Sequence, residues 1–549
     1  MIGFMEGIYG GILDKSFLEA YRPPRRTPRV EKVLRAYHAL LKDHPPSVVE
    51  QQGRVPDDML RKMGEMGLFG LSIPEAYGGL GFDLGEYLET VEGLAQWDLS
   101  LALVSIAHLS IGNKGVVLFG TDEQKEKYLR PAATGETIFS YALTEPKTGS
   151  DARHIETWAE RSPDGRHYIL NGQKTYITNA NYAGCLTVFA QLDPGRPGHM
   201  GAFLVETGWD GVQVGKDMPK MGLKASSTAA IQFKDVRVPV ENLLGRPGDG
   251  FKIAMTILNY GRLGLGAASA GMMAQSLADM KKRASSRIQF GVPIESFPLI
   301  QEKLVRARVN REVCSAMDAL TAAFLENDPL ANVAIESSHC KLFGTTRAWD
   351  TLYDALQVAG GSGFLTTQPY EKRMRDFRVT PIFEGTTEIH SIYPALFALR
   401  RMVKDMAAYK NRSFPRGTFY RDRLVQALRS VRWPLAFDDA VMKKASRLAR
   451  ANAKTIRWML LKGSLYYGSK VGGEELFLRR VTTLSLYTYG LLALVAKMEA
   501  DRKAGGFGPE DRDILEYFVE EARLARKADR KVLDSRRESL MKRIFRRIN

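Results

Sequence analysis

The chain has 549 residues, a length that favours three or four domains over one. Apolar residues make up 44% and charged residues 26% of it, which is ordinary for globular protein and excludes a fully disordered chain. Three widely separated cysteines form no CxxC pair and eight histidines form no HxxxH or HExxH motif, which excludes a disulfide-stapled scaffold and gives no support to a metal site.

The positive charge is concentrated in the last quarter of the chain. The formal net charge is +16, and residues 401–549 hold 34 Lys and Arg against 17 Asp and Glu, whereas residues 1–400 hold 44 against 45. Such an asymmetry predicts a basic module that meets nucleic acid or an anionic membrane, attached to a nearly neutral body. The alternative is a well-solvated helical surface.

The sequence indicates no spanning segment and no targeting segment. No run approaches the roughly 18–20 uninterrupted apolar residues that a bilayer requires. Residues 1–17 contain Glu6 and Asp14, and they lack both the basic start of a secretory signal and the Arg-rich character of a mitochondrial presequence. We therefore expect a cytoplasmic protein, with a peripheral position on the inner face of the membrane as a variant of that expectation.

Hydrophobic periodicity divides the chain into four regions. Residues 1–138 have helical spacing and predict an N-terminal α-helical domain. Residues 139–248 contain short, β-branched segments separated by turn residues, which is typical of an antiparallel β domain. Helical patterns return over 249–408 as a helical bundle, a proline-punctuated linker follows near 409–421, and residues 420–549 predict an extra, basic helical domain. The expected fold class is therefore an α+β multidomain protein.

A series of short motifs follows along the first three regions. They are YALTEPKTGSD (141–151), KTYITNA (174–180), MGLKAS (221–226) with DVRVP (235–239), RIQFG (287–291), QVAGGSGF (357–364), and RD (375–376) leading into IFEGTTEI (382–389). In this order they resemble the acyl-CoA dehydrogenase family, over roughly residues 55–400. The extra C-terminal module and the segment HLSIGNKGVVLFGT (108–121) make the chain most similar to the very-long-chain branch of that family.

The resemblance implies FAD as the cofactor. A flavin needs a flat pocket with backbone and hydroxyl donors, and partners for its pyrophosphate. Thr144, Ser150 and Thr178 supply hydroxyl groups in turns beside strands. By resemblance the isoalloxazine ring lies against Tyr176, where the family often has Trp. The full cofactor set that the resemblance implies is Tyr141, Leu143, Thr144, Gly149, Ser150, Tyr176, Thr178, Arg287, Gln289, Phe290, Gln357, Gly360, Gly361, Thr386 and Glu388.

Part of this set implies an oligomer. Arg287 and Gln289 resemble the pair that reaches the FAD phosphates across a subunit interface, and Gln357 with Gly360 and Gly361 resembles the adenine-side contact from the neighbouring subunit. We therefore expect a homo-oligomer, in its simplest form a dimer, with FAD held between subunits.

Glu384 is the candidate catalytic base. Removing hydrogens from Cα and Cβ of a thioester requires a base at Cα and a hydride acceptor at Cβ. A carboxylate in an apolar pocket suits the first task because its pKa rises toward neutrality when water is expelled. Glu384 follows the apolar Ile382-Phe383 and precedes Gly385, whose backbone can bend over a ligand. In some branches the base lies on an earlier helix, but that position is Gly261 here and glycine cannot abstract a proton.

The substrate side is less distinct in the sequence. The implied substrate residues are Ser150, Asn259, Arg262 and Gly385. Arg262 is expected to act electrostatically on the acid loop, with a structural ion pair as the alternative. Asn259 stands where the family often has Asp, and Ser391 replaces an Arg often found seven residues after the base. Small residues at Ser105 and Ala107, near the expected pocket floor, allow a long acyl chain, and they serve close helix packing equally well.

These inferences predict an FAD-dependent acyl-CoA dehydrogenase that oxidises a long-chain fatty acyl-CoA to the trans-2-enoyl-CoA. Glu384 would take the α-proton, FAD would take the β-hydride, and electrons would pass to electron-transfer flavoprotein. The alternative from another class is a flavin-containing nucleic-acid-binding protein of the alkylation-response type, which would use the basic C-terminal domain. A third reading is an assembly protein with little turnover, against which the intact Glu384 argues.

One segment of the basic module predicts a membrane contact. Residues 421–435 place Leu424, Leu428, Val431 and Leu435 at helical spacing, flanked by arginines. An apolar stripe edged by Arg is what an interfacial helix needs at an anionic membrane surface. Relatives in the very-long-chain branch attach to membranes through this region, which favours lipid. The same pattern also fits a helix packed on its own domain, and nucleic acid is the third alternative.

Overall fold

The computed structural model describes residues 3–193, 195–410, 421, 425 and 430–548. Its N-terminal region is helical, and side-chain oxygens of Thr27, Asp83, Asp98 and Thr121 accept the backbone N–H three residues on, which fixes where four of the helices begin. A π-helical turn, His108–Gly112, joins α7 (Leu99–Ala107) to α8 (Lys114–Phe119). The helices are α1 (Phe4–Tyr9), α2 (Ser16–Glu19), α3 (Pro28–Asp43), α4 (Pro46–Gln52), α5 (Asp57–Glu65), α6 (Leu84–Trp97), α7 (Leu99–Ala107), α8 (Lys114–Phe119) and α9 (Asp122–Thr134).

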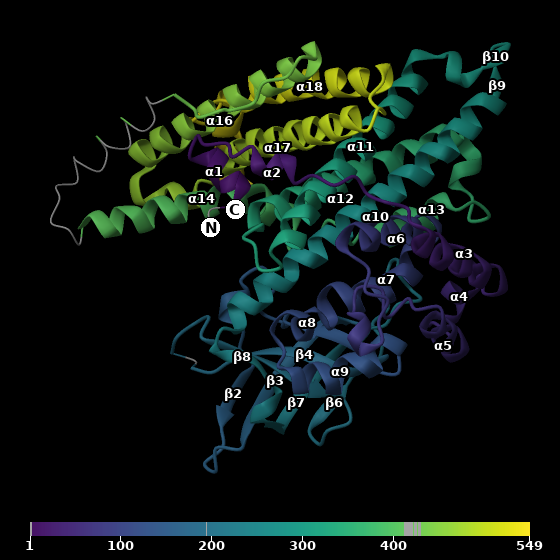
Figure 1. The fold of residues 1–549 in the computed structure, drawn as a ribbon, viewed down its shortest axis with the longest axis vertical. Coiled ribbons are helices and arrows are strands. Elements are labelled where there is room, and N and C mark those ends of the chain that lie inside the picture. Colours follow the sequence, from purple (N-terminus) through teal and green to yellow (C-terminus); the bar gives the residue numbers. More distant parts are fainter. Residues whose placement is uncertain (1–2, 194, 411–420, 422–424, 426–429, 549) are drawn as a thin grey trace.

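The middle of the chain forms an eight-stranded sheet, drawn at the bottom of Figure 1. Its strands are β1 (Ile138–Ala142), β2 (Trp158–Arg161), β3 (His167–Thr178), β4 (Ala183–Gln191), β5 (Met200–Glu206), β6 (Val212–Val214), β7 (Thr228–Pro239) and β8 (Leu243–Gly248). The order is β6-β7-β3-β2-β4-β5-β8, with β1 beside β4. Most pairs are antiparallel as expected, but β1 and β2 both run parallel to β4. Each parallel partner reaches β4 through an intervening connection, which parallel pairing requires.

Long helices form the centre of the molecule (Figure 1). They are α10 (Gly250–Ser286), α11 (Pro298–Asn327) and α12 (Ala334–Ala359), followed by α13 (Tyr370–Phe377) and α14 (Thr387–Lys410). The helix α10 packs against α6, α11 and α12, so it touches both the N-terminal helices and the bundle. A short hairpin of β9 (Ile288–Gln289) and β10 (Val292–Pro293) joins α10 to α11 at the end of the bundle that lies away from the sheet in Figure 1.

The basic C-terminal region adds further helices to the bundle. They are α16 (Ala440–Tyr467), α17 (Glu475–Lys503), α18 (Pro509–Asp529) and α19 (Arg536–Ile548). The helix α17 packs against α11 and α14 and joins this region to the body. Several cations of the C-terminal region form ion pairs, for example Lys444 with Glu516 at 2.7 Å and Lys497 with Glu312 at 3.0 Å. Part of the basic surface is therefore neutralised within the fold.

The expected helix over residues 421–435 is wrong for its second half. Leu424 and Leu428 lie outside the described residues, and residues 431–437 form no helix, with an isolated bridge at Arg432. The backbone of Arg432 pairs with the N-terminal segment, since its N–H donates to the Gly11 carbonyl and its carbonyl accepts from Leu13 N–H, both at 3.0 Å. Val431 is 5% exposed, so it belongs to the core and not to a lipid-facing stripe.

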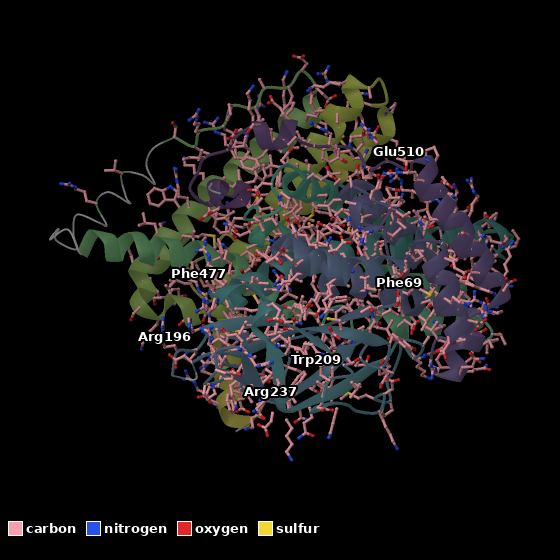
Figure 2. All side chains as sticks on the ribbon, turned by 60° about the horizontal axis from the view of Figure 1, so that its bottom comes forward. Phe69, Arg196, Trp209, Arg237, Phe477 and Glu510 are labelled. Atoms are coloured by element: carbon pink, nitrogen blue, oxygen red, sulfur yellow. The ribbon has the colours of Figure 1, made fainter. Side chains whose placement is uncertain are left out.

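Within the part of the chain that the structure describes, two segments are long and apolar enough to cross a membrane by composition alone. They are Leu99–Phe119 and Glu475–Lys503, and 83% and 78% of their apolar windows are buried inside the fold. Core helices of a globular protein pass the same test, so these segments are weak evidence for a span. Figure 2 shows side chains throughout the fold, with Phe477 labelled on α17 and Arg237 labelled on β7.

Candidate active site

Glu384 lies in the loop between α13 and α14, where two consecutive residues have left-handed backbone. The φ angles are 54° at Glu384 and 98° at Gly385. A non-glycine residue is strained in this region and persists there only when its surroundings hold it. A Cβ placed on Gly261 of α10 would lie 2.5 Å from Glu384 Oε2 and 2.7 Å from Ile111 Cγ2. The absence of a side chain at residue 261 therefore leaves the space that the Glu384 carboxyl group occupies.

The Glu384 carboxyl group is poised to exchange a proton near neutral pH. Its Oε2 atom is buried and has no hydrogen-bond partner among the described residues. Burial raises the pKa of Glu384 to about 7, and the positive charges of Arg262 and Lys341 limit that rise. A carboxyl group with a pKa near the working pH and a free oxygen can act as a general base or acid.

Arg262 is buried on α10, with 7% exposure. Its Nη1 donates to Asn259 Oδ1 at 3.3 Å, its guanidinium lies 5.8 Å from the centre of the Tyr393 ring, and its Nε has no partner among the described residues. Asn259 Oδ1 also accepts a hydrogen bond from Ser337 at 2.8 Å, which orients the amide. Within the described part of the chain Arg262 has no carboxylate within 4 Å. It therefore acts on Glu384 through space and not as half of an ion pair.

The residues expected around the flavin ring lie on neighbouring strands and loops. Thr175 N–H donates to the Thr144 carbonyl at 2.9 Å, and Lys174 Nζ donates to the Leu143 carbonyl at 3.1 Å, so the loop after β1 is held against β3. Tyr176 has φ 57° and is 67% exposed, which turns its ring out of the sheet.

This surface fits a planar heterocycle with a polar edge. A Cβ placed on Gly149 would meet nothing within 4 Å, and Gly149 and Ser150 are both exposed, so their backbone and the hydroxyl group are free to approach a ligand. Thr178 is partly exposed at the end of β3. Tyr141 hydroxyl donates to the Ala254 carbonyl of α10 at 3.2 Å, and burial together with the nearby Glu384 charge raises the pKa of Tyr141. Tyr141 thus connects this surface to the Glu384 loop.

The other expected cofactor residues lie at a different end of the bundle. Arg287, Gln289 and Phe290 are exposed on the β9–β10 hairpin, and the Phe290 ring is 93% exposed at φ 51°. Gln357 is exposed in the last turn of α12 and Gly360 and Gly361 are exposed just after it, and neither glycine has an atom within 4 Å of an added Cβ. One apolar cluster that contains Met280, Val358 and Ile294 joins these two groups. Figure 1 places the hairpin far from the sheet, so within one subunit the hairpin residues lie away from the strand that carries Tyr176 and Thr178.

Two further motifs connect the sheet to the bundle. Leu223 N–H donates to Asp376 Oδ1 at 2.5 Å, and Arg375 Nη1 donates to the Met221 carbonyl at 3.2 Å. Lys372 Nζ lies 2.6 Å from both Asp98 and Asp376. These contacts fix the sheet, and with it the Tyr176 surface, relative to the helices.

The remaining expected residues have local partners. Thr386 Oγ1 accepts from Ile389 N–H at 3.3 Å at the start of α14, Ser391 Oγ donates to the Thr387 carbonyl at 2.7 Å, and Glu388 is exposed. Ser105 and Ala107 are buried in α7, and Ser105 Oγ donates to the Leu68 carbonyl at 2.6 Å. The small residues of α7 are thus engaged in helix packing in this structure.

Sequence reasoning missed two residues that touch the Glu384 loop. Lys341 Nζ donates to the Gly385 carbonyl at 2.5 Å, and His390 Nε2 lies 3.0 Å from the Glu384 carbonyl. A lysine on the apolar side of α12 is the signal that could have identified the first, since buried lysines need a specific partner.

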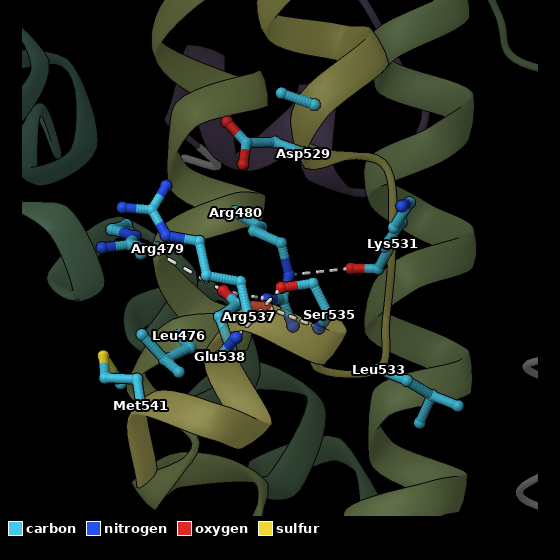
Figure 3. Close-up of a pocket in the computed structure, with 11 residues that line it drawn as sticks. Leu476, Arg479, Arg480, Asp529, Lys531, Leu533, Ser535, Arg537, Glu538 and Met541 are labelled. Carbon is cyan, nitrogen blue, oxygen red and sulfur yellow. Dashed lines mark hydrogen bonds and ion pairs between the residues drawn. The ribbon is translucent and has the colours of Figure 1, made fainter. Parts of the chain in front are cut away.

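A cavity of about 470 Å³ lies elsewhere, among the C-terminal helices (Figure 3). Arg480, 3% exposed, donates there to the carbonyls of Lys531 and Val532 at 3.0 Å and to Glu538 at 2.7 Å. Because the buried guanidinium of Arg480 already has partners within the fold, we assign this cavity no ligand.

Comparison with known proteins accounts for this arrangement. Three family models match in chain order, namely the N-terminal (residues 30–136), middle (140–236) and C-terminal (248–393) domains of acyl-CoA dehydrogenase. A mitochondrial very long-chain specific acyl-CoA dehydrogenase from Bos taurus is 41% identical over 365 residues, which are 65% of this chain and 55% of that protein. The chain thus spans about half the length of this relative.

Two bacterial proteins match over more of their length. A probable acyl-CoA dehydrogenase from Bacillus subtilis (strain 168) is 33% identical over 484 residues, 84% of this chain and 79% of that protein. The crystal structure of an acyl-CoA dehydrogenase complexed with FAD from Bacillus anthracis superposes with a TM-score of 0.82 at 29% identity, covering 99% of this chain and 95% of that one. With all three domains of one family in order, and relatives matched across both body and C-terminal helices, the chain belongs to the acyl-CoA dehydrogenase family.

Proposed function

We propose that the chain is an FAD-dependent acyl-CoA dehydrogenase in which Glu384 removes the α-proton of the acyl thioester. The observation that supports this most directly is the buried, unpartnered Oε2 atom of Glu384, held against the bare backbone of Gly261. FAD, when bound, supplies the acceptor for the hydrogen and electron pair that leave Cβ. The product of the two steps is a trans-2-enoyl-CoA.

The chain's own residues prepare the base for this reaction. The burial that raises the pKa of Glu384 to about 7 keeps a proton there from being lost to water, while Arg262 and Lys341 keep the ionised form accessible. Asn259 orients Arg262, and we propose that these two residues, with Ser150 and Gly385, line the thioester and CoA side of the site.

We propose that FAD binds across two subunits. The flavin end would lie against Tyr176, the backbone around the buried Leu143, and the groups of Thr144, Gly149, Ser150 and Thr178, which are partly or fully exposed. Arg287, Gln289, Phe290, Gln357, Gly360 and Gly361 would come from the partner of a dimer, because within one subunit they lie at the far end of the bundle. The bare apolar surfaces of Phe290 and Phe364, 93% and 80% exposed, support an interface there.

The substrate proposal is a long-chain acyl-CoA, and the acceptor proposal is electron-transfer flavoprotein. The first rests on the bovine relative, which is specific for very long chains by its name. The test is an anaerobic titration of the purified flavoprotein with acyl-CoAs of increasing length, read as bleaching of the flavin absorbance. Glu384→Gln should still bind FAD and acyl-CoA but lose about 10²–10⁴-fold in the rate of bleaching. Near-normal bleaching in this variant would remove Glu384 from the role.

We further propose that the basic region meets an anionic lipid surface through α19. The side chains of Leu540, Met541, Ile544, Phe545 and Ile548 are 39–75% exposed and recur at helical spacing. Arg543, Arg546 and Arg547 lie between them on the same helix. An exposed apolar stripe edged by arginines suits an interfacial helix, and it replaces residues 421–435 as the candidate for this contact.

Flotation with vesicles of graded anionic lipid content tests the α19 proposal. Ile544→Asp with Phe545→Asp should abolish flotation, whereas Leu524→Asp, at a 70% exposed apolar residue of α18, should not. The nucleic-acid alternative rests on charge alone, without site geometry among the described residues. Duplex-DNA binding at the same salt, without flotation, would overturn the lipid proposal and restore that alternative.

A further inference from the structure

The strained loop of Glu384 is held from two sides. With Glu384 and Gly385 both at positive φ, two successive carbonyl groups of the loop turn toward the bundle. Lys341 on α12 donates to one of them, and His390 on α14 contacts the other. Each carbonyl of the strained pair therefore has its own side-chain partner from a different helix.

Lys341 is committed to this contact by its surroundings. It is fully buried, and among the described residues the Gly385 carbonyl, at 2.5 Å, is its hydrogen-bond acceptor. The charged groups that act on it are Glu384 in the loop, Arg262 on α10 and Glu388 on α14. Burial lowers the pKa of Lys341 to about 7. Burying an ammonium group is unfavourable unless a hydrogen bond compensates it, and here the hydrogen bond to the Gly385 carbonyl does so.

His390 contacts the loop in a single tautomer. Its Nε2 faces the Glu384 carbonyl at 3.0 Å, and a carbonyl can only accept, so Nε2 carries the hydrogen. Its Nδ1, 2.7 Å from Ser338 Oγ, then accepts from that hydroxyl group. Burial and the charges of Arg262 and Lys341 lower the pKa of His390 well below its ordinary value, so the ring stays neutral. A Cβ on Gly385 would lie 2.7 Å from Nε2, so the ring packs directly on that glycine.

We infer that Lys341 and His390 are positioning residues that clamp the Glu384–Gly385 backbone and so aim the Glu384 carboxyl group at the substrate Cα. The inference rests on the proposed function for what Glu384 does, but the clamp itself is a property of the backbone. Neither residue is placed to touch the reacting atoms. Lys341 acts through the Gly385 carbonyl and also through its charge on Glu384, His390 acts through the Glu384 carbonyl, and Ser338 acts through His390.

The test compares variants of the FAD-bound enzyme by hydrogen–deuterium exchange over residues 379–389 and by single-turnover flavin reduction. Lys341→Met and His390→Leu remove the donors and should speed exchange in this peptide. They should slow reduction by about 10–100-fold, since a misplacement near 1 Å has costs of this size. Acyl-CoA binding should change little. His390→Gln, whose amide can replace both hydrogen bonds, should recover most of the rate.

The matched control is His339→Leu. His339 is the neighbouring buried histidine, and its Nε2 pairs with Ser485 of α17 at 2.8 Å, away from the loop. This variant should lower the melting temperature without altering exchange over 379–389 or the reduction rate. If a donor deletion prevents folding, Ser338→Ala, which only frees His390 to rotate, serves in its place. It should also speed exchange and slow flavin reduction, by smaller factors.

Two outcomes would overturn the clamp. One is unchanged exchange and rate in Lys341→Met and His390→Leu, and the other is an equal loss in His339→Leu or no recovery in His390→Gln. Failure of the proposed function is separate, because then the unmutated enzyme itself would not bleach with any acyl-CoA, while the exchange measurement would still report on the clamp.

Discussion

Two buried arginines in this molecule have opposite surroundings. Arg480, in the C-terminal helices, has its guanidinium paired with Glu538 and with two carbonyl groups (Figure 3). Arg262, beside Glu384, has one long hydrogen bond to Asn259 and an unpartnered Nε among the described residues. Buried polar groups in native proteins are normally satisfied, so an exception points to a role outside the fold itself. The comparison separates charges that hold the molecule together from charges kept free for a ligand.

Removing the paired arginine should have the largest effect on stability. Arg480→Met leaves Glu538 and two backbone carbonyl groups without their donor, and breaking such a buried pair costs about 3 kcal/mol or more. We expect a clear fall in the melting temperature by calorimetry, with flavin reduction unchanged at temperatures where the protein is folded. A large rate loss in this variant would break the comparison.

Removing the unpaired arginine should affect catalysis instead. Arg262→Met deletes a positive charge that holds down the pKa of Glu384, so that pKa should rise above its value of about 7. Glu384 acts as a base only when ionised, so the rate of flavin reduction should rise with pH through about 7 in the unmutated enzyme. In the variant that rise should move to higher pH, with about a ten-fold or greater loss at pH 7.

The melting temperature supplies the control for Arg262→Met. A methionine in place of a poorly paired guanidinium relieves a buried charge, so stability should change little. A fall as large as that of Arg480→Met would mean that Arg262 is structural after all.

Substitutions of two glycines on α10 test where the Glu384 carboxyl group lies. Gly261→Ala puts a methyl group where Glu384 Oε2 and Ile111 lie, at 2.5 and 2.7 Å. The flexible carboxyl group should swing aside and lower the reduction rate by roughly ten-fold, the order that a small misplacement costs. Gly264→Ala, one turn further, would meet its neighbours at 3.5–3.9 Å and should behave as the parent does in single-turnover measurements. Equal rates in the two variants would argue against the site geometry.

Exposed ion pairs of the basic region should matter least. Lys444 pairs with Glu516 at 2.7 Å and with Glu520 at 3.0 Å, but the three side chains are 31–53% exposed. Water and salt screen such pairs, so Lys444→Ala should cost about 0.5 kcal/mol or less. A shift in melting temperature that approaches that of Arg480→Met would show that the surface charges form a network.

The sequence motifs pointed to the candidate site residues, but not to the residues that hold the Glu384 loop in place. Glu384, Arg262 and Tyr176 sit in recognisable segments because their chemistry needs particular residue types in a particular order. Lys341 and His390 were missed because their role depends on which helix side faces a loop, and single-sequence periodicity does not show that. Gly261 was read as excluding a base, whereas its second role, making room for Glu384, is visible only in three dimensions.

The fold class followed from the alternation of helical and strand patterns. The predictions that failed concern contacts between residues that are far apart in the sequence. The helix expected over residues 421–435 fails where the backbone of Arg432 pairs with Gly11 and Leu13, more than 400 positions earlier in the sequence. No local pattern can reveal such a partner. The parallel pairing of β1 with β4 is of the same kind, since β2 and β3 separate these two strands in the sequence.

The pairing of Arg432 with Gly11 and Leu13 holds the N-terminal segment between helices of the body and of the C-terminal region, as an intramolecular wedge. Phe4, Met5 and Ile8 of α1 are buried between α12 and α16, and Met5 N–H donates to Glu336 at 2.7 Å. A chain shortened to residues 30–393, the span of the three family domains, would lose the wedge and the helices that it holds. The part of α12 that contacts α1, around Glu336, would then be uncovered. We therefore expect residues 3–29 to be needed for stable folding of the larger architecture, and a peptide of residues 3–21 should rescue a chain that lacks them.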